Sequence, residues 1–152
     1  MSPSTAPVLH VQAMRVYWED TDAGGVVFYA NYLKFFERAR TEWLRRLGYS
    51  QEALRLTDDP ARRVMFMVTD TQLQYRRPAR LDDWIEVDVA LQRPGAASLE
   101  IRQQAWRGPE LLCEGTIRIG CVDPLTLRPK RLPDDLQRAL RNPAGPDALN
   151  TT

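Results

Sequence analysis

Residues 15–49 read RVYWEDTDAGGVVFYANYLKFFERARTEWLRRLGY, and their second half contains the pattern that decides the fold. Apolar side chains recur there at spacings of three or four positions: Tyr32, Phe36, Ala39, Trp43 and Leu47. This spacing predicts an amphipathic helix over residues 30–47, and Gly48 stands where a helix C-terminus favours glycine. Three further apolar residues lie off that stripe: Leu33, Phe35 and Leu44. Because the helix is apolar over so much of its circumference, we expect a sheet to wrap around it.

Segments typical of strands flank this helix on both sides. Before it, residues 9–17 alternate between apolar and more polar side chains, with an interruption at Val16, and predict a first strand. After it come a possible helical turn at 50–56 and four predicted strands: 64–77, 84–93, 98–107 and 111–122. A last short helix is predicted over 133–141, which begins with a proline and two aspartates. The order of strand, long helix and four strands predicts an α+β fold with an antiparallel sheet.

The composition limits the class of protein. A chain of 152 residues with 43% hydrophobic and 27% charged residues is typical of one globular domain. Its formal net charge of +1 excludes a global basic field that would attract nucleic acid or an anionic membrane, so neither is expected as a partner. Residues 1–10 do not read as a secretory signal, and no apolar stretch is long enough to span a bilayer. We therefore expect a cytoplasmic protein without a transmembrane segment.

Cysteine and histidine are too scarce to build the usual reactive or metal sites. Cys113 and Cys121 lie in one predicted strand, which separates them by about 26 Å and excludes a disulfide between them. These two cysteines and the single histidine, His10, cannot supply a clustered zinc site, so no metal is expected. A histidine-based catalytic device would have to use His10, which we expect instead to face solvent on the first strand. The glycine-rich nucleotide-binding motifs are absent, and no cofactor is expected.

The acidic segment 19–25 between the first strand and the helix has three competing interpretations. Asp20 and Asp22 imitate the start of an EF-hand loop, but Asn31 stands where that loop needs a bidentate glutamate, so calcium is not expected. In a purely structural interpretation, the acids and glycines satisfy turn geometry and cap the helix. In a functional interpretation, a carboxylate beside the positive helix end is a base, and the backbone N–H groups there stabilise an oxyanion. The residue types alone leave the last two interpretations open.

The same stretch also resembles the active-site segment of the 4-hydroxybenzoyl-CoA thioesterase family. That family's pattern is a basic residue, an aliphatic residue, four spaced positions, Thr or Cys, and the catalytic Asp; here it reads Arg15-Val16, four residues, Thr21-Asp22. More closely, the chain is similar to the Tol-Pal-associated acyl-CoA thioesterases of the YbgC type. Three further stretches match their pattern: YRRPARLDD at 75–83, GAASL at 95–99 and CVDPLTLRPKRLP at 121–133. The resemblance thus covers residues 15–133.

This resemblance implies a hotdog fold, in which an antiparallel sheet of about five strands wraps around one long helix. We expect a single thioesterase domain of this kind over residues 1–141. Residues 142–152 are rich in Pro, Gly and Asn, and this composition predicts a mobile tail. Asp22 would act on the thioester carbonyl, as a nucleophile or as a general base to water, and the backbone N–H of Tyr29 would polarise the thioester oxygen. Many close relatives have His where this chain has Tyr29. The resemblance further implies a homotetramer built from dimers, with each active site at a dimer interface.

The expected substrate is an acyl-CoA, with acyl carrier protein as the alternative thiol carrier. Three cations in the segment 128–131, Arg128, Lys130 and Arg131, are candidates for binding the phosphates of CoA. A second basic cluster contains Arg76, Arg77 and Arg80, and for both clusters the alternative is solvated surface charge. Two other functions stay open: a non-catalytic acyl-binding or scaffolding protein of the Tol-Pal envelope system, and a dehydratase, which would need His10.

Overall fold

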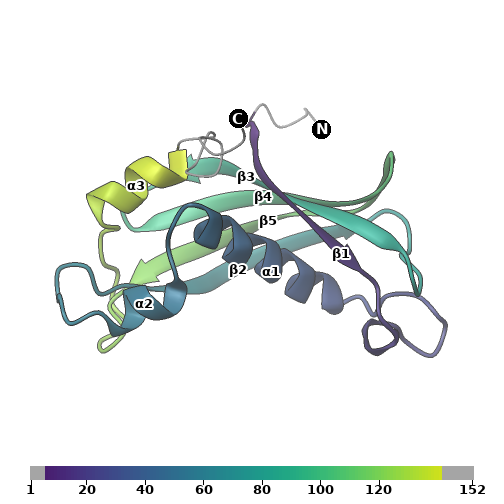
Figure 1. Cartoon of the computed structure of the whole chain (residues 1–152), viewed down its shortest axis with the longest axis horizontal. Helices are drawn as coiled ribbons and strands as arrows, with labels where there is room; N and C mark the ends of the chain where they lie inside the picture. Colours follow the sequence, from purple (N-terminus) through teal and green to yellow (C-terminus); the bar gives the residue numbers. More distant parts are fainter. Residues whose placement is uncertain (1–5, 142–152) are drawn as a thin grey trace.

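The structure is a computed structural model that describes residues 6–141, and Figure 1 shows its arrangement. One antiparallel sheet has the strand order β1-β3-β4-β5-β2. Its strands are β1 (Val8–Arg15), β2 (Met65–Tyr75), β3 (Trp84–Pro94), β4 (Ser98–Arg107) and β5 (Glu110–Val122). The helical elements are η1 (Trp18–Asp20), α1 (Asn31–Arg46), α2 (Gln51–Leu56) and α3 (Asp134–Arg141). The predicted α+β architecture, a five-stranded antiparallel sheet around one long helix, is confirmed.

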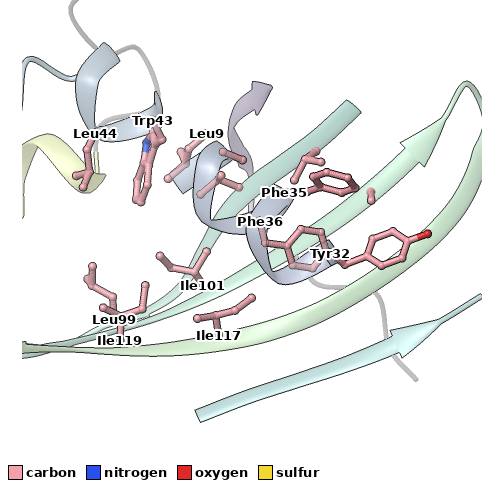
Figure 2. Packing of buried hydrophobic residues seen from close by; sticks show 14 of the residues in the cluster. Leu9, Tyr32, Phe35, Phe36, Trp43, Leu44, Leu99, Ile101, Ile117 and Ile119 are labelled. Carbon is pink, nitrogen blue, oxygen red and sulfur yellow. The ribbon is translucent and has the colours of Figure 1, made fainter. Parts of the chain in front are cut away.

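Helix α1 lies across one face of the sheet and supplies much of the core (Figure 2). All five residues of the predicted stripe are buried, and so are Phe35 and Leu44, whereas Leu33 is 44% exposed. The facing side chains come from β4 and β5 and include Leu99, Ile101, Ile117 and Ile119. Burial of these apolar surfaces is the main source of stability, at about 1.5–3 kcal/mol for each large side chain.

The predicted end of the helix at Gly48 is confirmed. Gly48 has a φ of +93°, in the left-handed region that glycine adopts without steric cost. Its N–H donates to the carbonyl of Arg45 at 2.9 Å, and the N–H of Tyr49 donates to the carbonyl of Leu44 at 2.9 Å. These two bonds form a Schellman motif, which satisfies carbonyls that the end of the helix would otherwise leave free.

The first strand corrects the expectation for His10. The pairing of β1 with β3 shifts between Val8 and His10, so a β-bulge places both Leu9 and His10 on the buried side. Simple alternation would bury only one of two neighbours, and the expectation that His10 faces solvent is therefore wrong: its side chain is 8% exposed. Burial lowers the pKa of His10, and within the described residues its Nδ1 has no hydrogen-bond partner.

Strand β2 forms one edge of the sheet and pairs with β5 alone. It is exposed along most of its length, including Met67 and Val68 at 40% and 52%. Opposite Leu73, β5 has Gly115, where a Cβ atom would lie 2.2 Å from the carbonyl oxygen of Gln72. A larger residue at Gly115 would therefore push β2 away from the sheet.

Both cysteines lie on β5 as buried free thiols, and burial raises the pKa of Cys113 to about 12 and that of Cys121 to about 11. They stay protonated at neutral pH and are poor nucleophiles. None of the helices between residues 6 and 141 has the length and apolar composition that a membrane crossing needs. The expected mobile tail at 142–152 lies outside the described residues.

Candidate active site

The acidic segment folds into a small hairpin that leads into α1. A β-bridge joins Thr21 to Val27, the N–H of Asp22 donates to the carbonyl of Val26 at 2.8 Å, and the N–H of Phe28 donates to the carbonyl of Asp20 at 2.9 Å. The turn itself needs Gly25, whose φ is +80°. Asp22 therefore sits near the tip of a hydrogen-bonded loop rather than in a disordered acidic run.

The carboxylate of Asp22 is held by the loop yet open to reactants. Its Oδ1 accepts hydrogen bonds from the N–H groups of Gly24 at 2.8 Å and Val26 at 3.4 Å. A Cβ atom at Gly24 would come within 3.2 Å of this oxygen, so glycine leaves the carboxylate its space. The side chain is exposed, and Oδ2 has no hydrogen-bond partner among residues 6–141. One oxygen thus orients the group, and the other is free to meet water or substrate.

Asp20 has a different, structural role in the same hairpin. Its side chain is 7% exposed, and its Oδ2 accepts from the N–H of Tyr17 at 2.8 Å. Its carbonyl accepts from the Nδ2 of Asn31, the first residue of α1, at 2.7 Å. The purely structural interpretation of the segment is therefore right for Asp20. It is wrong in one part, because no side chain caps α1, whose N-cap residue is Ala30.

The start of α1 leaves a backbone donor unused. Within the described part of the chain, the N–H of Tyr29 makes no hydrogen bond. The Tyr29 carbonyl accepts from the Oη of Tyr75 at 3.0 Å, which fixes this part of the chain. The Tyr29 ring lies 4.8 Å from that of Phe28 and 6.3 Å from that of Tyr75, between ring centroids. A free N–H at a helix N-terminus can stabilise a developing negative charge.

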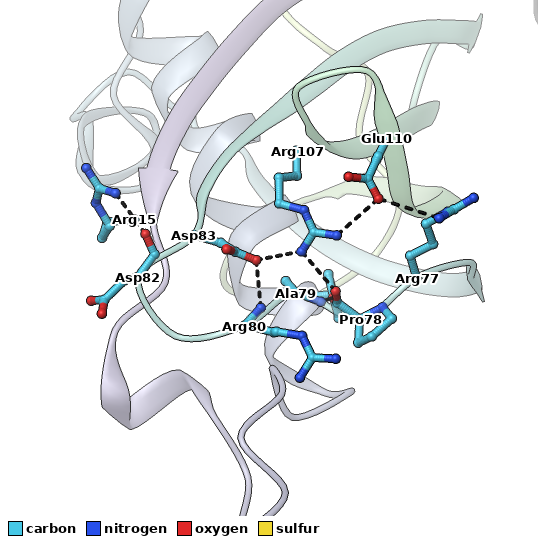
Figure 3. Close-up of polar contacts among 10 residues, drawn as sticks. Arg15, Arg77, Pro78, Ala79, Arg80, Asp82, Asp83, Arg107 and Glu110 are labelled. Carbon is cyan, nitrogen blue, oxygen red and sulfur yellow. Dashed lines mark hydrogen bonds and ion pairs between the residues drawn. The ribbon is translucent and has the colours of Figure 1, made fainter.

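Residues 76–83 brace the hairpin from the side (Figure 3). The N–H of Val27 donates to the carbonyl of Ala79 at 2.8 Å, and a β-bridge joins Val26 to Arg80. Arg107 holds this segment in turn, with hydrogen bonds to the carbonyl of Pro78 at 3.1 Å and to the Oδ2 of Asp83 at 2.6 Å.

The pKa of Asp83 shows how tightly this brace is held. Burial raises that pKa, but the Arg80 N–H, donating to the carboxylate at 2.8 Å, and Arg107 lower it by more, so the net direction is down. Arg107 also bonds Glu110 at 3.2 Å. The resemblance singled out residues 75–83, whereas Arg107 gave no sequence signal, because the two partners through which it holds this segment, Asp83 and Pro78, lie 24 and 29 positions away.

The cations predicted to bind phosphate are not beside Asp22 in the same chain. The segment between β5 and α3 lies at the left of Figure 1, and the loop between β1 and α1 lies at the right. Lys130 Nζ donates to the carbonyls of Pro60 and Arg63 and lies 3.8 Å from the Asp123 carboxylate, so its charge holds the segment that precedes β2. Arg131 lies 3.5 Å from Asp134.

The remaining predicted cations are on the surface. The Arg128 side chain is exposed and makes no ion pair with any described residue. In the second basic cluster, Arg76 pairs with Glu114 at 3.3 Å and Arg77 with Glu110 at 3.6 Å, while the Arg80 side chain is exposed. Among residues 6–141, no three His, Cys, Asp or Glu side chains are placed to hold a metal ion.

Known proteins are similar to this chain over most of its length. Residues 16–140 match the thioesterase-like superfamily. The chain is 44% identical over 124 residues to the acyl-CoA thioester hydrolase YbgC of Escherichia coli O6:H1, which covers 81% of this chain and 89% of that protein. It is 36% identical over 129 residues to the acyl-CoA thioesterase YbgC of Haemophilus influenzae, covering 85% and 92%. The crystal structure of a probable thioesterase from Bartonella henselae has a TM-score of 0.76 and 31% identity, covering 82% of this chain and 98% of that one.

Proposed function

The chain belongs to the thioesterase-like superfamily and has its hotdog fold, and from this premise we propose that it hydrolyses an acyl-CoA thioester to a free acid and CoA. The observation that carries the proposal is the Asp22 carboxylate. One of its oxygens is oriented by loop N–H groups and the other is open to reactants, at a hairpin that leads into an uncapped helix N-terminus. We take residues 1–141 as the catalytic domain.

In this proposal Asp22 begins the reaction by one of two routes. As a nucleophile, its oxygen attacks the thioester carbon, the C–S bond breaks, CoA leaves as the thiolate and takes up a proton, and water then cleaves the mixed anhydride. As a general base, Asp22 takes a proton from water while the water oxygen attacks, and the same proton reaches the departing thiolate. Exposure of the side chain supports both routes, because each one needs water at the carboxylate.

The developing oxyanion is assigned to the N–H of Tyr29. That N–H has no hydrogen-bond partner in the described chain, and the bond from Tyr75 to the Tyr29 carbonyl holds this segment in place. Because the donor is a main-chain group, replacement of the histidine of relatives by tyrosine leaves it intact. One such donor typically contributes about 10²–10³ in turnover.

We further propose a dimer that pairs the exposed β2 edges of two copies, and a homotetramer of two such dimers. An uncovered edge strand offers unpaired N–H and C=O groups to another chain. A twofold axis makes the pair antiparallel, so the Tyr75 end of one β2 lies beside the Met65 end of the other. Each Asp22 hairpin then faces the partner end that holds the segment 128–131. There the exposed Arg128, together with Arg131, can reach the phosphates of CoA. Lys130 adds its charge from the place where it bonds the carbonyls of Pro60 and Arg63.

The remaining parts of the proposal concern the cell. We propose a cytoplasmic enzyme, with acyl carrier protein as the alternative thiol carrier. Association with the Tol-Pal envelope system stays a prediction from the resemblance. A non-catalytic acyl-binding role is the competing function, and it would use the same site without turnover.

The test is release of free thiol from a panel of acyl-CoAs of different chain length and aromaticity, measured with the purified protein and with Asp22→Asn. We expect hydrolysis of at least one acyl-CoA by the wild type and loss of it in the variant. Acyl-CoA binding without thiol release in the wild type would favour the non-catalytic role.

Sedimentation at micromolar concentration checks the assembly. A fully active monomer would contradict the proposed dimer.

A further inference from the structure

A cavity of about 130 Å³ lies between the second half of α1 and the sheet. Its wall is mostly apolar and includes Trp43, Phe66, Leu99, Ile101 and Ile119. The polar lining comes from one face of α1 and from the start of α2. The cavity is close in size to one of about 150 Å³ that holds a benzene ring in another protein. It therefore fits a short apolar chain or a single ring.

One cation, Arg40, lines this apolar cavity. Its guanidinium Nη1 donates to the Oε1 of Gln103 at 2.9 Å. Gln103 is fully buried and is held in turn, because its Nε2 donates to the carbonyls of Phe36 at 3.1 Å and Asp88 at 3.2 Å. This network fixes the guanidinium in position against the cavity wall.

Arg40 forms no ion pair with any of residues 6–141, because no carboxylate lies within 4 Å of its guanidinium. Burial lowers the pKa of Arg40, whereas Glu37, which also lines the cavity, acts on Arg40 from a greater distance and raises that pKa. The Glu37 Oε1 accepts from the Oγ1 of Thr41 at 2.9 Å. A guanidinium has five N–H donors in a planar fork that matches a carboxylate. Partial burial weakens the competition from water, so an arriving carboxylate would gain a charge-assisted hydrogen bond.

We propose that this cavity is the acyl subsite of the thioesterase and that Arg40 selects acyl groups that end in a carboxylate. This inference rests on the proposed function and goes beyond it by naming the chemical class of the acyl group. The apolar wall holds the methylene chain of a short dicarboxylic acyl group, and the guanidinium binds its far end.

The cavity serves the Asp22 of the other copy in the β2-paired dimer. From Phe66, which lines the cavity, to Tyr75, which contacts Tyr29, β2 runs for nine residues, or about 30 Å. No short acyl group spans that distance within one chain. Antiparallel pairing of two β2 edges places the Tyr75 end of one copy beside the Phe66 end of the other, and so brings a hairpin to the cavity.

The test compares glutaryl-CoA with pentanoyl-CoA, which have acyl chains of equal length that end in a carboxylate and in a methyl group. It uses the wild type, Arg40→Gln, Arg40→Lys and the control Arg38→Gln, which removes an exposed cation of α1 outside the cavity. The glutamine amide can still donate to Gln103. We expect the wild type to prefer glutaryl-CoA in kcat/KM by about tenfold or more. Arg40→Gln should lower kcat/KM for glutaryl-CoA more than for pentanoyl-CoA and so abolish that preference.

The ratio is measured with both substrates on one sample, so a partly misfolded variant does not distort it. Arg40→Lys should retain part of the preference and Arg38→Gln all of it. Independently of any variant, free glutarate should inhibit the wild type at a concentration about tenfold lower than pentanoate. An equal ratio in the wild type and Arg40→Gln, or a wild-type preference for pentanoyl-CoA, overturns the inference while the thioesterase proposal stands. If no acyl-CoA is hydrolysed, the proposed function itself fails.

Discussion

The two ends of α1 differ in how their backbone groups are satisfied. At the start, no side chain caps the helix and the N–H of Tyr29 is unbonded within the described residues. At the end, the N–H groups of Gly48 and Tyr49 bond the last carbonyls, and the Oη of Tyr49 donates to Asp135 of α3 at 2.7 Å. The first end leaves donors available for a ligand, whereas the second uses its groups to hold the fold together.

This difference has a simple electrostatic meaning. The N-terminus of a helix has a partial positive charge and favours an anion nearby, and the C-terminus has the opposite charge. An oxyanion can use the first end only if no side chain occupies its N–H groups. Substitutions near the start of α1 should therefore change turnover, and those near its end should change the free energy of unfolding.

The largest expected effect is that of Asp22→Asn. Turnover should fall by about 10² to 10⁴, because the amide can neither attack the thioester nor accept a proton from water. The free energy of unfolding should hardly change, since the amide oxygen can still accept from the N–H groups of Gly24 and Val26. Thiol release and urea unfolding measure the two quantities on one sample.

Asp20→Asn is the matched control in the same hairpin. It should lower stability, because a neutral amide replaces the buried carboxylate and turns the charge-assisted hydrogen bond from the Tyr17 N–H into a weaker neutral one. It should cost less turnover than Asp22→Asn, because Asp20 holds the loop and is not open to reactants. Equal turnover in the wild type and Asp22→Asn would remove Asp22 from the mechanism.

The next effect separates the backbone of Tyr29 from its side chain. Tyr29→Pro removes the N–H and should lower turnover by about 10² to 10³, the usual cost of one oxyanion donor. Tyr29→Phe keeps the N–H and the ring that packs near Phe28, and it should change turnover by less than about tenfold. Steady-state kinetics with one acyl-CoA distinguish the two variants. A loss in Tyr29→Phe as large as that in Asp22→Asn would assign a direct role to the hydroxyl.

At the other end of the helix, Gly48→Ala should affect stability alone. The φ of +93° is strained for any residue with a Cβ atom, and we expect a loss of about 1–2 kcal/mol in the free energy of unfolding. Turnover at a temperature where the variant is folded should stay at the wild-type level. A large loss of turnover in the folded variant would mean that the two ends are not functionally separate.

The smallest effect depends on pH and tests the contact between Tyr49 and α3. A hydrogen bond from Arg62 and one from Tyr49 lower the pKa of Asp135 below its usual value. A carboxyl group of this kind contributes stability that is fully present above its unfolded pKa of about 3.9 and is lost as the pH falls through the folded pKa. The gap in unfolding midpoint between the wild type and Asp135→Asn should therefore be larger at pH 6 than at pH 3. Because the ion pair is partly exposed, the gap should be small.

The part of this protein that the sequence determined by itself is the part governed by local periodicity. Hydrogen bonds in a helix join residues four apart, so the stripe from Tyr32 to Leu47 and the stop at Gly48 were readable without any tertiary information. Alternation likewise predicted the four later strands to within a few residues. The spaced motif from Arg15 to Asp22 located the candidate site by resemblance, and the hairpin then separated the structural Asp20 from the open Asp22.

Only the tertiary structure decided how distant residues meet. The bulge that buries His10 depends on the pairing of β1 with β3, and Lys130 reaches carbonyl groups 67 and 70 positions away. Arg40 forms a hydrogen bond with Gln103, which lies 63 positions away in the sequence. The residues next to either one in the sequence do not indicate this contact. Buried polar groups must find partners wherever the fold brings them, because an unpaired one costs about 1–3 kcal/mol. That requirement acts between elements, so no local pattern of residues encodes it.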